Sequence, residues 1–334
     1  MSKILTISVA AYNIEKYIHK MMQSLIDAGC MEDLEILIVD DGSKDNTAKL
    51  AQEYEARYPD SVKHVEKENG GHGSTINKGI ELASGKYFRA LDGDDWVNSE
   101  NLKELVSTLR KTDVDMVVCD FDRCYSDGRV IKEEFSDLKP DREYTFDEIT
   151  HHTSWICYHS IVYKTQLLKN QHIRLDEHCF YVDEEYDLFP IPYIQTVTYF
   201  NKPVYCYRLG VNEQSVSPES RRKNIKHGFT VAESLLNFYT EESVDLSEAK
   251  NKYIGYGIAD HCVWQIESLL LFPCSASKMK EIKTFDKNIQ AKCNEIYLKM
   301  GQLGKQSRKI NLLRRSGYFM YFILCIYKRM RTNK

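Results

Sequence analysis

The sequence predicts an α/β protein in which a mostly parallel sheet is flanked by helices and followed by a helical C-terminal region. Two observations predict this fold class. Short apolar runs alternate with amphipathic stretches over roughly the first hundred residues, which is typical of a parallel sheet covered on both faces. After about Ser217 the strand signals end, and helical periodicity continues to the end of the chain.

The alternation places the individual elements in order. Strands are expected at Ile4–Ala10, Glu35–Asp40, Val62–Glu66, Tyr87–Leu91 and Met116–Cys119. Helices are expected between them at Ile14–Ala28, Asp45–Arg57, Ser74–Ala83 and Ser99–Lys111. A turn at Ser126-Asp-Gly-Arg129 predicts a hairpin with Val130–Glu134, and two short strands are expected on either side of Asn201-Lys-Pro203.

The later part of the chain carries longer helical patterns. They cover Asn224–Tyr239, Ser247–Leu271 and Ser277–Met300. We therefore predict a catalytic domain over residues 1–217 and a helical region over residues 218–334.

Composition narrows the class of protein. Hydrophobic residues make up 43% of the 334 residues and charged residues 28%, which fits a folded globular chain. A net charge of −4 argues against a nucleic-acid partner, because no basic field covers the whole protein. The ten cysteines form no C-x-x-C pair, and the N-terminus lacks the pattern of a secretory signal. These features predict a cytoplasmic protein with free thiols.

Acidic groups follow two predicted strands and open a later helix. Asp40-Asp41-Gly42-Ser43 and Asp92-Gly93-Asp94-Asp95 come directly after strands, and Asp183-Glu184-Glu185 begins a helix. Ligands bind beyond the carboxyl ends of parallel strands, so the first two groups are candidates for one site. Clustered carboxylates repel one another, and Mg²⁺ or Mn²⁺ relieves this repulsion while leaving positions open for phosphate oxygens.

Each acidic group also has a purely structural interpretation. Asp40–Ser43 fits a turn and a helix N-cap, and Asp92–Asp95 fits a loop before a helix. Asp183–Glu185 fits the acidic first turn that helices favour. The first two groups together, at the ends of neighbouring strands, favour a shared binding site over two separate turns.

Four segments match a known family in order and spacing. They are Ser8-Val-Ala-Ala-Tyr-Asn13, Val39-Asp-Asp-Gly-Ser-Lys-Asp45, Ala83-Ser-Gly-Lys-Tyr87 and Leu91-Asp-Gly-Asp-Asp-Trp96. Through them the chain resembles the bacterial inverting glycosyltransferases of family 2, over residues 3–125 and more weakly to about residue 210. The resemblance implies the GT-A fold, a Rossmann-like sheet flanked by helices.

The resemblance also implies residue roles on the donor side. Ala10, Ala11 and Tyr12 are expected to hold the nucleobase and ribose, with Tyr12 against the base. Asp41 is expected to accept a hydrogen bond from uracil. In the D-x-D motif Asp92 is expected near the ribose, beside Gly93, and Asp94 is expected to bind the metal.

The third acidic group matches the family's Glu-Asp pair less cleanly. The alignment puts Val182 on the family's Glu and Asp183 on its catalytic Asp, whereas a slip of one residue selects Glu184. In either register the carboxylate accepts the proton of the acceptor hydroxyl while that oxygen attacks the anomeric carbon.

The segment Asn69–Gly79 follows the family at Asn69, Gly71, Asn77 and Gly79 but departs elsewhere. The family commonly has a basic residue where this chain has Ile76. His72 or Lys78 is the candidate replacement for a contact to the donor. The segment does not fit a dinucleotide-binding pattern, because the third glycine is missing; a flexible turn before a helix explains its glycines as well.

Other candidates on the acceptor side are histidines and tryptophans. His151, His152, His159 and His178 lie in the expected region, and one of them is a candidate metal ligand. Trp96 and Trp155 are candidates for lining the acceptor site. Loop and core positions are the competing interpretation for all of them.

The C-terminal tail has its own character. From Gly301 to Lys334 there are nine Lys or Arg and no Asp or Glu, and the apolar run Gly317–Tyr327 is flanked by Arg314-Arg315 and Lys328-Arg329. This run is too short to span a bilayer. A helix over residues 316–331 is expected either at the surface of an anionic inner membrane or buried against the helical region.

The sequence therefore predicts a metal-dependent glycosyltransferase with Mn²⁺ or Mg²⁺ as cofactor. The expected donor is a nucleotide sugar, and UDP is favoured because the family that the chain resembles commonly uses UDP-sugars. The expected acceptor is a hydroxyl in a polysaccharide, lipid-linked oligosaccharide or glycoprotein. Peripheral attachment at the cytoplasmic face of the inner membrane is expected, which is consistent with a lipid-linked acceptor, and homo-oligomers are left open. The alternative is a catalytically inactive nucleotide-sugar-binding or membrane-associated protein. A nucleotidyltransferase is disfavoured because the glycine-rich loop after the first strand is missing.

Overall fold

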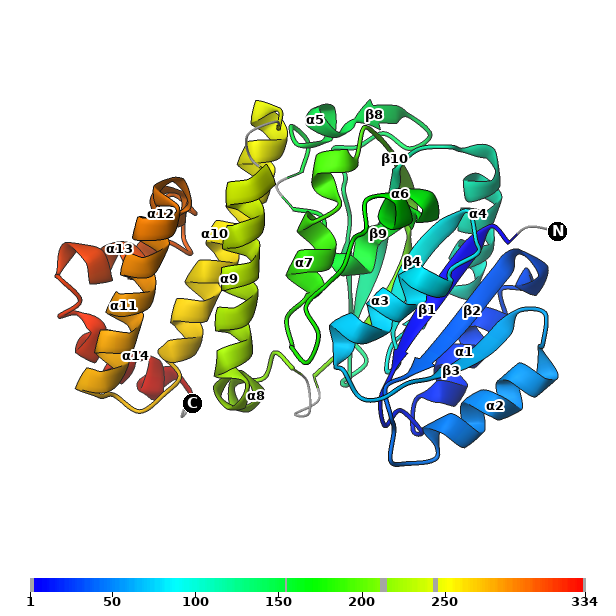
Figure 1. Ribbon diagram of the computed structural model, residues 1–334, viewed down its shortest axis with the longest axis horizontal. Coiled ribbons are helices and arrows are strands. Elements are labelled where there is room, and N and C mark those ends of the chain that lie inside the picture. Colours follow the sequence, from blue (N-terminus) through cyan, green and yellow to red (C-terminus); the bar gives the residue numbers. More distant parts are fainter. Residues whose placement is uncertain (1–2, 154, 211–214, 243–245, 333–334) are drawn as a thin grey trace. The chain divides into compact units, whose positions relative to one another are not determined.

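The computed structural model describes residues 3–153, 155–210, 215–242 and 246–332. The chain divides into two compact units, Met1–Val211 and Asn212–Lys334. The first is a mixed α/β unit and the second consists of helices (Figure 1). We describe each unit by itself.

A ten-stranded sheet forms the centre of the first unit. Its main path runs in the order β3-β2-β1-β4-β9-β6-β10-β5, with β7 beside β6 and β8 beside β10. The strands are β1 Leu5–Ala11, β2 Leu34–Asp40, β3 Val62–Glu66, β4 Tyr87–Asp92, β5 Trp96–Val97, β6 Met116–Tyr125, β7 Val130–Glu133, β8 Glu143–Thr145, β9 Ile161–Lys164 and β10 Thr196–Leu209.

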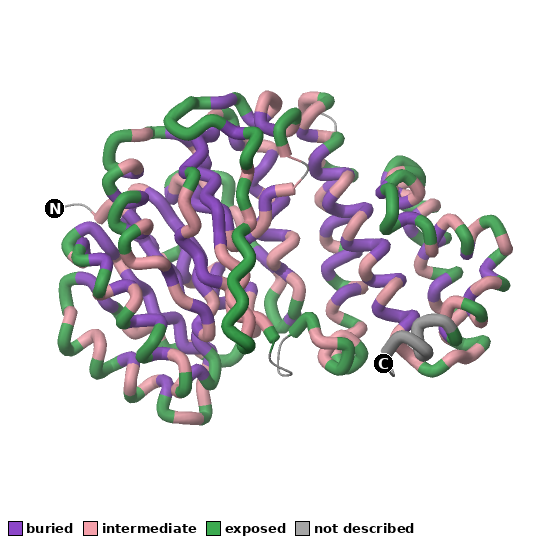
Figure 2. Tube along the Cα trace, turned by 180° about the vertical axis from the view of Figure 1, so that it is seen from behind, coloured by how far each residue is buried: buried purple, intermediate pink, exposed green. Residues whose placement is uncertain are grey.

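The pairing of these strands changes along the sheet. β1, β2, β3 and β4 are parallel to one another, as are β6 and β10. The short strand β9 joins the two parallel sets and is antiparallel to both β4 and β6. β1, β2 and β4 are buried along nearly their whole length, because helices cover both faces (Figure 2).

Helices of the first unit pack in two groups. α3 (His72–Leu82) lies over β1 and β2 and contacts α6 (Thr165–Asn170), whereas α1 (Ile18–Ile26) contacts α2 (Thr47–Arg57) and α4 (Ser99–Lys111). α5 (Phe146–Ile149) and α7 (Asp183–Leu188) are short. Short 3-10 turns at Met31–Asp33, Tyr158–Ser160 and Ile191–Tyr193 complete the unit.

The structure confirms most predicted elements of this unit and corrects several boundaries. α1 begins at Ile18 rather than Ile14, and α3 begins at His72 rather than Ser74. The hairpin of β6 and β7 is confirmed. The two short strands expected near Asn201 are one strand, β10, because its register against β6 shifts around Pro203 instead of ending there. Proline has no N–H for the ladder, so a local irregularity suffices to accommodate it.

The second unit contains helices α8 to α14. They are α8 Pro218–Lys223, α9 Ile225–Glu242, α10 Glu248–Leu269, α11 Ala276–Lys292, α12 Asn294–Met300, α13 Arg308–Arg315 and α14 Tyr321–Thr332. α10 carries apolar residues on several faces, and it contacts α8, α9, α11 and α12. The single helix predicted over Ser277–Met300 is interrupted at Cys293, which is extended (φ −147°, ψ 91°).

A buried ion pair ties the end of this unit together. Asp286 on α11 is fully buried and accepts hydrogen bonds from the Arg314 guanidinium (Nη2–Oδ1 2.6 Å) and from the Tyr318 hydroxyl. The Arg314 guanidinium also stacks on Tyr297, 3.5 Å from the ring centroid. Arg314 was expected to flank a membrane helix; it points instead into the protein.

The last helix is shorter than expected, and the residues at and just before its start include both buried and exposed side chains. It begins at Tyr321 instead of residue 316. Tyr318, Tyr321 and Cys325 are buried, whereas Phe319, Ile323 and Ile326 are 74%, 53% and 58% exposed. No helix in the described part of the chain has the length and apolar character needed to cross a bilayer.

Candidate active site

The carboxyl ends of β1, β2 and β4 meet at one edge of the sheet. Ala11 pairs with Asp40 across β1 and β2, and Ala10 pairs with Asp92 across β1 and β4. The Gly93 N–H donates to the Ala10 carbonyl at 3.0 Å. A Cβ at Gly93 would lie 2.7 Å from that carbonyl oxygen, so glycine is needed for this close approach. The register therefore joins the first predicted segment to the D-x-D motif.

Asp41 holds the next loop in place. Its N–H donates to the Ala11 carbonyl at 2.8 Å, and its carboxylate is almost completely buried. Oδ1 accepts hydrogen bonds from Lys67 Nζ (2.7 Å) and the Gly70 N–H (2.8 Å), and Oδ2 accepts one from the Gly71 N–H (2.8 Å). The Asn69 side chain donates to the Asp41 carbonyl at 2.9 Å. Asp41 and Asn69 thus belong to one loop structure.

Tyr12 stands at the end of β1 with its ring exposed. Its side chain is 49% exposed, although neighbouring Ala11 is buried. The following residue, Asn13, has a φ of 54° and is held by the loop after β2: its N–H donates to Ser43 Oγ, and its Oδ1 accepts from the Lys44 N–H. An exposed aromatic ring on a fixed loop offers a flat surface for a planar ligand.

A histidine lies between the D-x-D motif and the third acidic group. His72 Nε2 is 3.2 Å from Asp183 Oδ1 and 3.7 Å from Asp92 Oδ1. The Tyr158 hydroxyl donates to Asp92 Oδ1 at 3.1 Å, and its ring lies 5.8 Å from the His72 ring. Residues 72, 92, 158 and 183 thereby converge from four separate segments of the chain.

The charges in this cluster shift one another's protonation. Burial lowers the pKa of His72, but the hydrogen bond to Asp183 and the charges of Asp92, Asp183 and Asp94 raise it to about 9. Burial raises the pKa of Asp92 to about 7, and Asp183 and Asp94 add to this while His72 opposes it. Burial also raises the pKa of Asp183, but the hydrogen bond and charge of His72 outweigh it and leave that pKa below the usual range.

The other acids of the D-x-D segment contact the end of β10. Asp94 Oδ2 lies 2.5 Å from Arg208 Nη2. Asp95 is buried and accepts hydrogen bonds from the Tyr205 hydroxyl and the Arg208 N–H, both at 2.7 Å. These contacts follow from the antiparallel pairing of β5 with β10, which aligns Trp96 with Cys206.

The residues present fit a divalent cation. Asp92, Asp95 and His159 offer ligand atoms that all lie within 4.8 Å of one another. Burial lowers the pKa of His159 to about 3, so its imidazole is neutral, as a metal ligand must be. Carboxylate oxygens and a neutral imidazole nitrogen are both common ligands of divalent ions. The predicted ligand Asp94 adjoins this group, and its side chain, 36% exposed, is more accessible than that of Asp95.

The third acidic group has one residue at the site and another buried in the core. Asp183, the first residue of α7, contacts His72. Glu185 is buried and its Oε2 accepts the Asp176 N–H at 2.7 Å. Asp187 is also buried, and burial raises its pKa well above the usual value.

Several other candidates lie elsewhere. Ile76 is buried in the core, and Lys78 pairs with Glu81 on the exposed side of α3 at 2.6 Å. His151 and His152 are exposed on the loop after α5. The ring of Trp96 is covered by the Lys20 ammonium, which lies 2.9 Å from the ring centroid. His178 is exposed, and its N–H donates to the Gly70 carbonyl.

The sequence interpretation missed three residues of the cluster. Tyr158, Tyr205 and Arg208 contact the D-x-D acids through their side chains. They lie on a short turn and a late strand, outside the strongest motif matches. Tyr205-Cys-Tyr-Arg208 lies at the end of a predicted strand, and residues at strand ends are candidates for a binding site.

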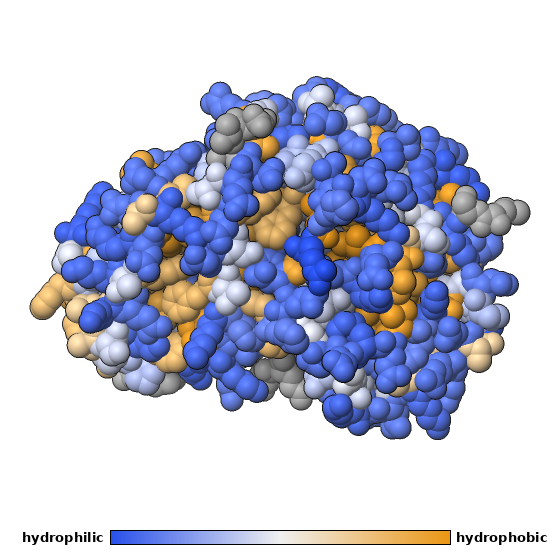
Figure 3. Space-filling model, in the orientation of Figure 1, coloured by the Kyte–Doolittle hydropathy of each residue, from blue (hydrophilic) through white to orange (hydrophobic). Residues whose placement is uncertain are grey.

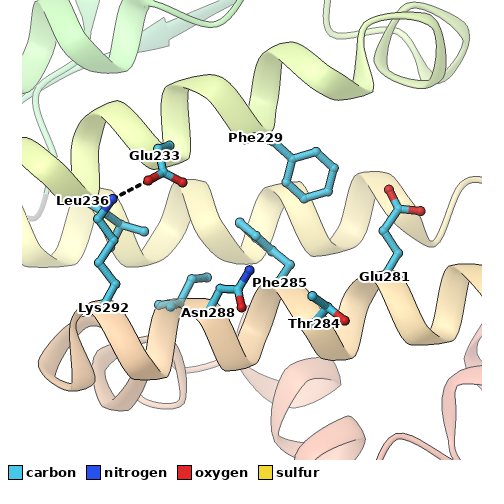
Figure 4. A pocket seen from close by; sticks show the side chains of 9 residues that line it. Phe229, Glu233, Leu236, Glu281, Thr284, Phe285, Asn288 and Lys292 are labelled. Carbon is cyan, nitrogen blue, oxygen red and sulfur yellow. Dashed lines mark hydrogen bonds and ion pairs between the residues drawn. The ribbon is translucent and has the colours of Figure 1, made fainter.

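The second unit contains a groove of a different kind (Figure 4). It has a volume of about 280 Å³ and lies between α9 and α11, where Phe229 and Phe285 pack edge to face. At its rim Glu233 forms an ion pair with Lys292. Two acids, Glu233 and Glu281, line the groove beside its apolar residues, and each of them pairs with a lysine.

Comparison with known proteins decides the family. The model of the family described as glycosyl transferase family 2 matches residues 6–171, which contain β1 to β4 and the D-x-D motif. The chain carries a family 2 glycosyltransferase domain. This confirms the family predicted from the four sequence segments.

Relatives and solved structures agree with this glycosyltransferase assignment. The chain is 27% identical over 294 residues to the uncharacterized glycosyltransferase EpsJ of Bacillus subtilis, covering 85% of this chain and 82% of EpsJ. It resembles the structure of S. aureus TarS 1-349 in complex with UDP (TM-score 0.65, 20% identity), covering 98% of this chain and 91% of that one.

A third resemblance is to the mannosyltransferase PcManGT of Pyrobaculum calidifontis in complex with GDP-Man and Mn²⁺. The TM-score is 0.52 at 15% identity, covering all of this chain and 89% of that one. These structural likenesses confirm the predicted GT-A fold with C-terminal helices.

Proposed function

We propose that this glycosyltransferase moves a sugar from a UDP-sugar to an acceptor hydroxyl of a bacterial glycan, with inversion at the anomeric carbon. The observation that carries the proposal is the convergence of Asp92, Asp183 and His72 beside the edge formed by β1, β2 and β4. The structural neighbour TarS, solved with UDP and with UDP-GlcNAc, supports a UDP-linked donor.

The donor half of the proposal uses the strand ends. The exposed Tyr12 ring stacks on the base, and the backbone of Ala10 and Ala11 faces the nucleoside. Asp41 Oδ2, which accepts one hydrogen bond from the Gly71 N–H, accepts a second from the base, since Oδ1 already accepts from Lys67 and Gly70. Asn69 supports this loop, and Asp92 and Gly93 lie at the ribose.

Asp94 is the proposed metal ligand, with Mn²⁺ or Mg²⁺ as the ion. Its carboxylate is 36% exposed, and it stands between Gly93 and Asp95 in the motif. When bound, the ion neutralises charge on the departing diphosphate. Arg208, which now contacts Asp94, is a second positive charge on the same side of the site.

Asp183 is the proposed catalytic base, in preference to Glu184. It is the member of the acidic run that contacts His72 beside Asp92. The acceptor oxygen attacks the anomeric carbon as the bond from that carbon to the diphosphate oxygen breaks, and the hydroxyl proton passes to Asp183. A single displacement inverts the configuration, and the low pKa of Asp183 keeps it ionised for this role.

A panel of nucleotide sugars, with and without Mn²⁺, tests the proposal. The cognate UDP-sugar is expected to raise the melting temperature most, and only with Mn²⁺, because ligands that bind the folded state stabilise it by mass action. Release of UDP to an acceptor, and the anomeric configuration of the product by NMR, then test transfer. Binding without any turnover would instead support the inactive nucleotide-sugar-binding protein.

We further propose that the C-terminal helix attaches the enzyme to an anionic membrane surface, where a lipid-linked acceptor is presented. Phe319, just before α14, and Ile323 and Ile326 on α14 are exposed, whereas Tyr318 and Tyr321 are buried. Apolar side chains therefore face outward where a surface helix usually carries polar ones. Hydrophobic residues are also visible among hydrophilic ones on the helical part drawn in Figure 3.

Charge favours a bilayer over a second copy of the chain at this surface. Residues 301–334 carry nine Lys or Arg and no acid, so two copies of the tail would repel each other. Sedimentation with vesicles is expected to require anionic lipid and to be lost in Phe319→Ser/Ile323→Ser. Binding that persists in the double variant, or a dimer that dissociates in it, would contradict the attachment.

A further inference from the structure

His72 occupies a place in the site that the donor and base assignments leave unexplained. It is the first residue of α3, and its imidazole lies against one carboxylate of the D-x-D motif and against Asp183. We propose that His72 is a positioning residue that fixes the Asp183 carboxylate for proton transfer. The inference rests on the proposed role of Asp183 as base.

The backbone around His72 is built for close contact with the segment that carries Asp183. Gly71 has a φ of 82°, and a Cβ there would lie 3.2 Å from backbone atoms of His178 and Cys179. At Gly73 a Cβ would lie 2.1 Å from the Asp176 carbonyl oxygen. Glycine on both sides of His72 therefore lets the loop before α7 approach the start of α3.

Hydrogen bonds hold the same two segments together. Asn77 Oδ1 accepts the Leu175 N–H at 2.8 Å, and its Nδ2 donates to the Leu175 carbonyl at 2.9 Å. The His178 N–H donates to the Gly70 carbonyl. His72 and Asp183 thus sit on two segments joined by backbone contacts, which leaves little freedom in the distance between them.

The geometry separates the two oxygens of Asp183. His72 Nε2 contacts Oδ1 at 3.2 Å, so this contact orients the carboxylate and directs Oδ2 to the acceptor proton. Carboxylate–imidazole contacts of this kind fix the orientation of a reacting group in other enzymes, and their loss typically costs 10-fold or more. Neither Lys78 nor Ile76 occupies an equivalent place.

Variants at His72 distinguish positioning from donor binding. His72→Leu is expected to lower kcat roughly 10- to 100-fold while the affinity for UDP with Mn²⁺ changes by less than about twofold. His72→Gln keeps an N–H near the same place and is expected to recover part of kcat. If His72→Leu does not fold, the comparison of His72→Gln and His72→Asn takes its place, because the shorter Asn does not reach Asp183.

A double-mutant cycle with Asp183→Asn supplies the decisive comparison. The double variant His72→Leu/Asp183→Asn is expected to be no slower than Asp183→Asn, since His72 acts through Asp183. The control Lys78→Gln, on the same helix but paired with Glu81, is expected to keep wild-type kinetics. Additive losses in the cycle, or weaker UDP binding with unchanged kcat, would overturn the positioning role. Full activity of Asp183→Asn would instead refute the base assignment itself.

Discussion

Acids paired with cations occur in both units of the chain, but their surroundings differ. In the helical unit Asp286 is fully buried, and the Arg314 guanidinium and the Tyr318 hydroxyl satisfy it. In the glycosyltransferase unit two cations, His72 and Arg208, lie against a larger set of carboxylates, Asp92, Asp94, Asp95 and Asp183.

The difference teaches how to separate a structural acid from a functional one. A matched pair holds helices together and needs nothing further. Burial raises the pKa of Asp92 and Asp95, and the neighbouring acids raise it further, so this cluster gains stability from a bound cation. The predictions below test this contrast, from the largest expected effect to the smallest.

The largest effect is expected from Asp183→Asn. Removing the base should lower kcat by roughly 10²- to 10⁴-fold, because amide nitrogen does not accept the acceptor proton. Steady-state kinetics measure the loss, and calorimetry with UDP and Mn²⁺ is expected to show donor binding close to that of the wild type. If Glu184→Gln abolishes turnover and Asp183→Asn does not, the base lies one residue later.

Asp286→Ala is expected to act on stability instead. It leaves the Arg314 charge without its carboxylate, which typically costs about 3–5 kcal/mol in the free energy of unfolding. Urea denaturation followed by circular dichroism measures this change. The contrast between the two acids fails if the variant is as stable as the wild type.

Asp94→Ala is expected to abolish the part of donor binding that needs Mn²⁺. A donor present at about 100 times its Kd stabilises the folded protein by about 2.7 kcal/mol, and this stabilisation should disappear in the variant. Thermal shift with UDP and Mn²⁺ measures it. If UDP and Mn²⁺ stabilise Asp94→Ala as much as the wild type, the metal binds Asp92, Asp95 and His159 without Asp94.

The smallest effect is expected from a pair that is only partly buried. Glu281 pairs with Lys278 three residues earlier on α11, at 2.7 Å. Glu281→Gln should change the free energy of unfolding by less than about 1 kcal/mol, since solvent screens such pairs. A change as large as that of Asp286→Ala would mean that burial is not what separates the two acids.

The strand ends could be predicted from sequence because each acid directly follows a buried apolar run. Asp41 and Asp92 were located in this way, and the register of β1 with its neighbours joins them. The contact of Arg208 with Asp94 was not predictable, since it depends on the antiparallel pairing of β5 and β10 between distant segments. Local patterns carry no signal for such pairings.

The helical region shows the same limit. Apolar periodicity runs through Cys293 without a glycine or proline, so the sequence predicted one helix where the chain forms α11 and α12. The inward role of Arg314 was hidden because a basic residue near a chain end fits a membrane surface equally well. Only the buried partner, Asp286, distinguishes the two interpretations.

The most direct test of the central claim is calorimetric titration of UDP into the wild-type chain with and without Mn²⁺. If the carboxylates of the first unit share a divalent cation that binds the diphosphate, Mn²⁺ should strengthen UDP binding at least about tenfold, or about 1.4 kcal/mol. Equal affinity in the two titrations would contradict the account.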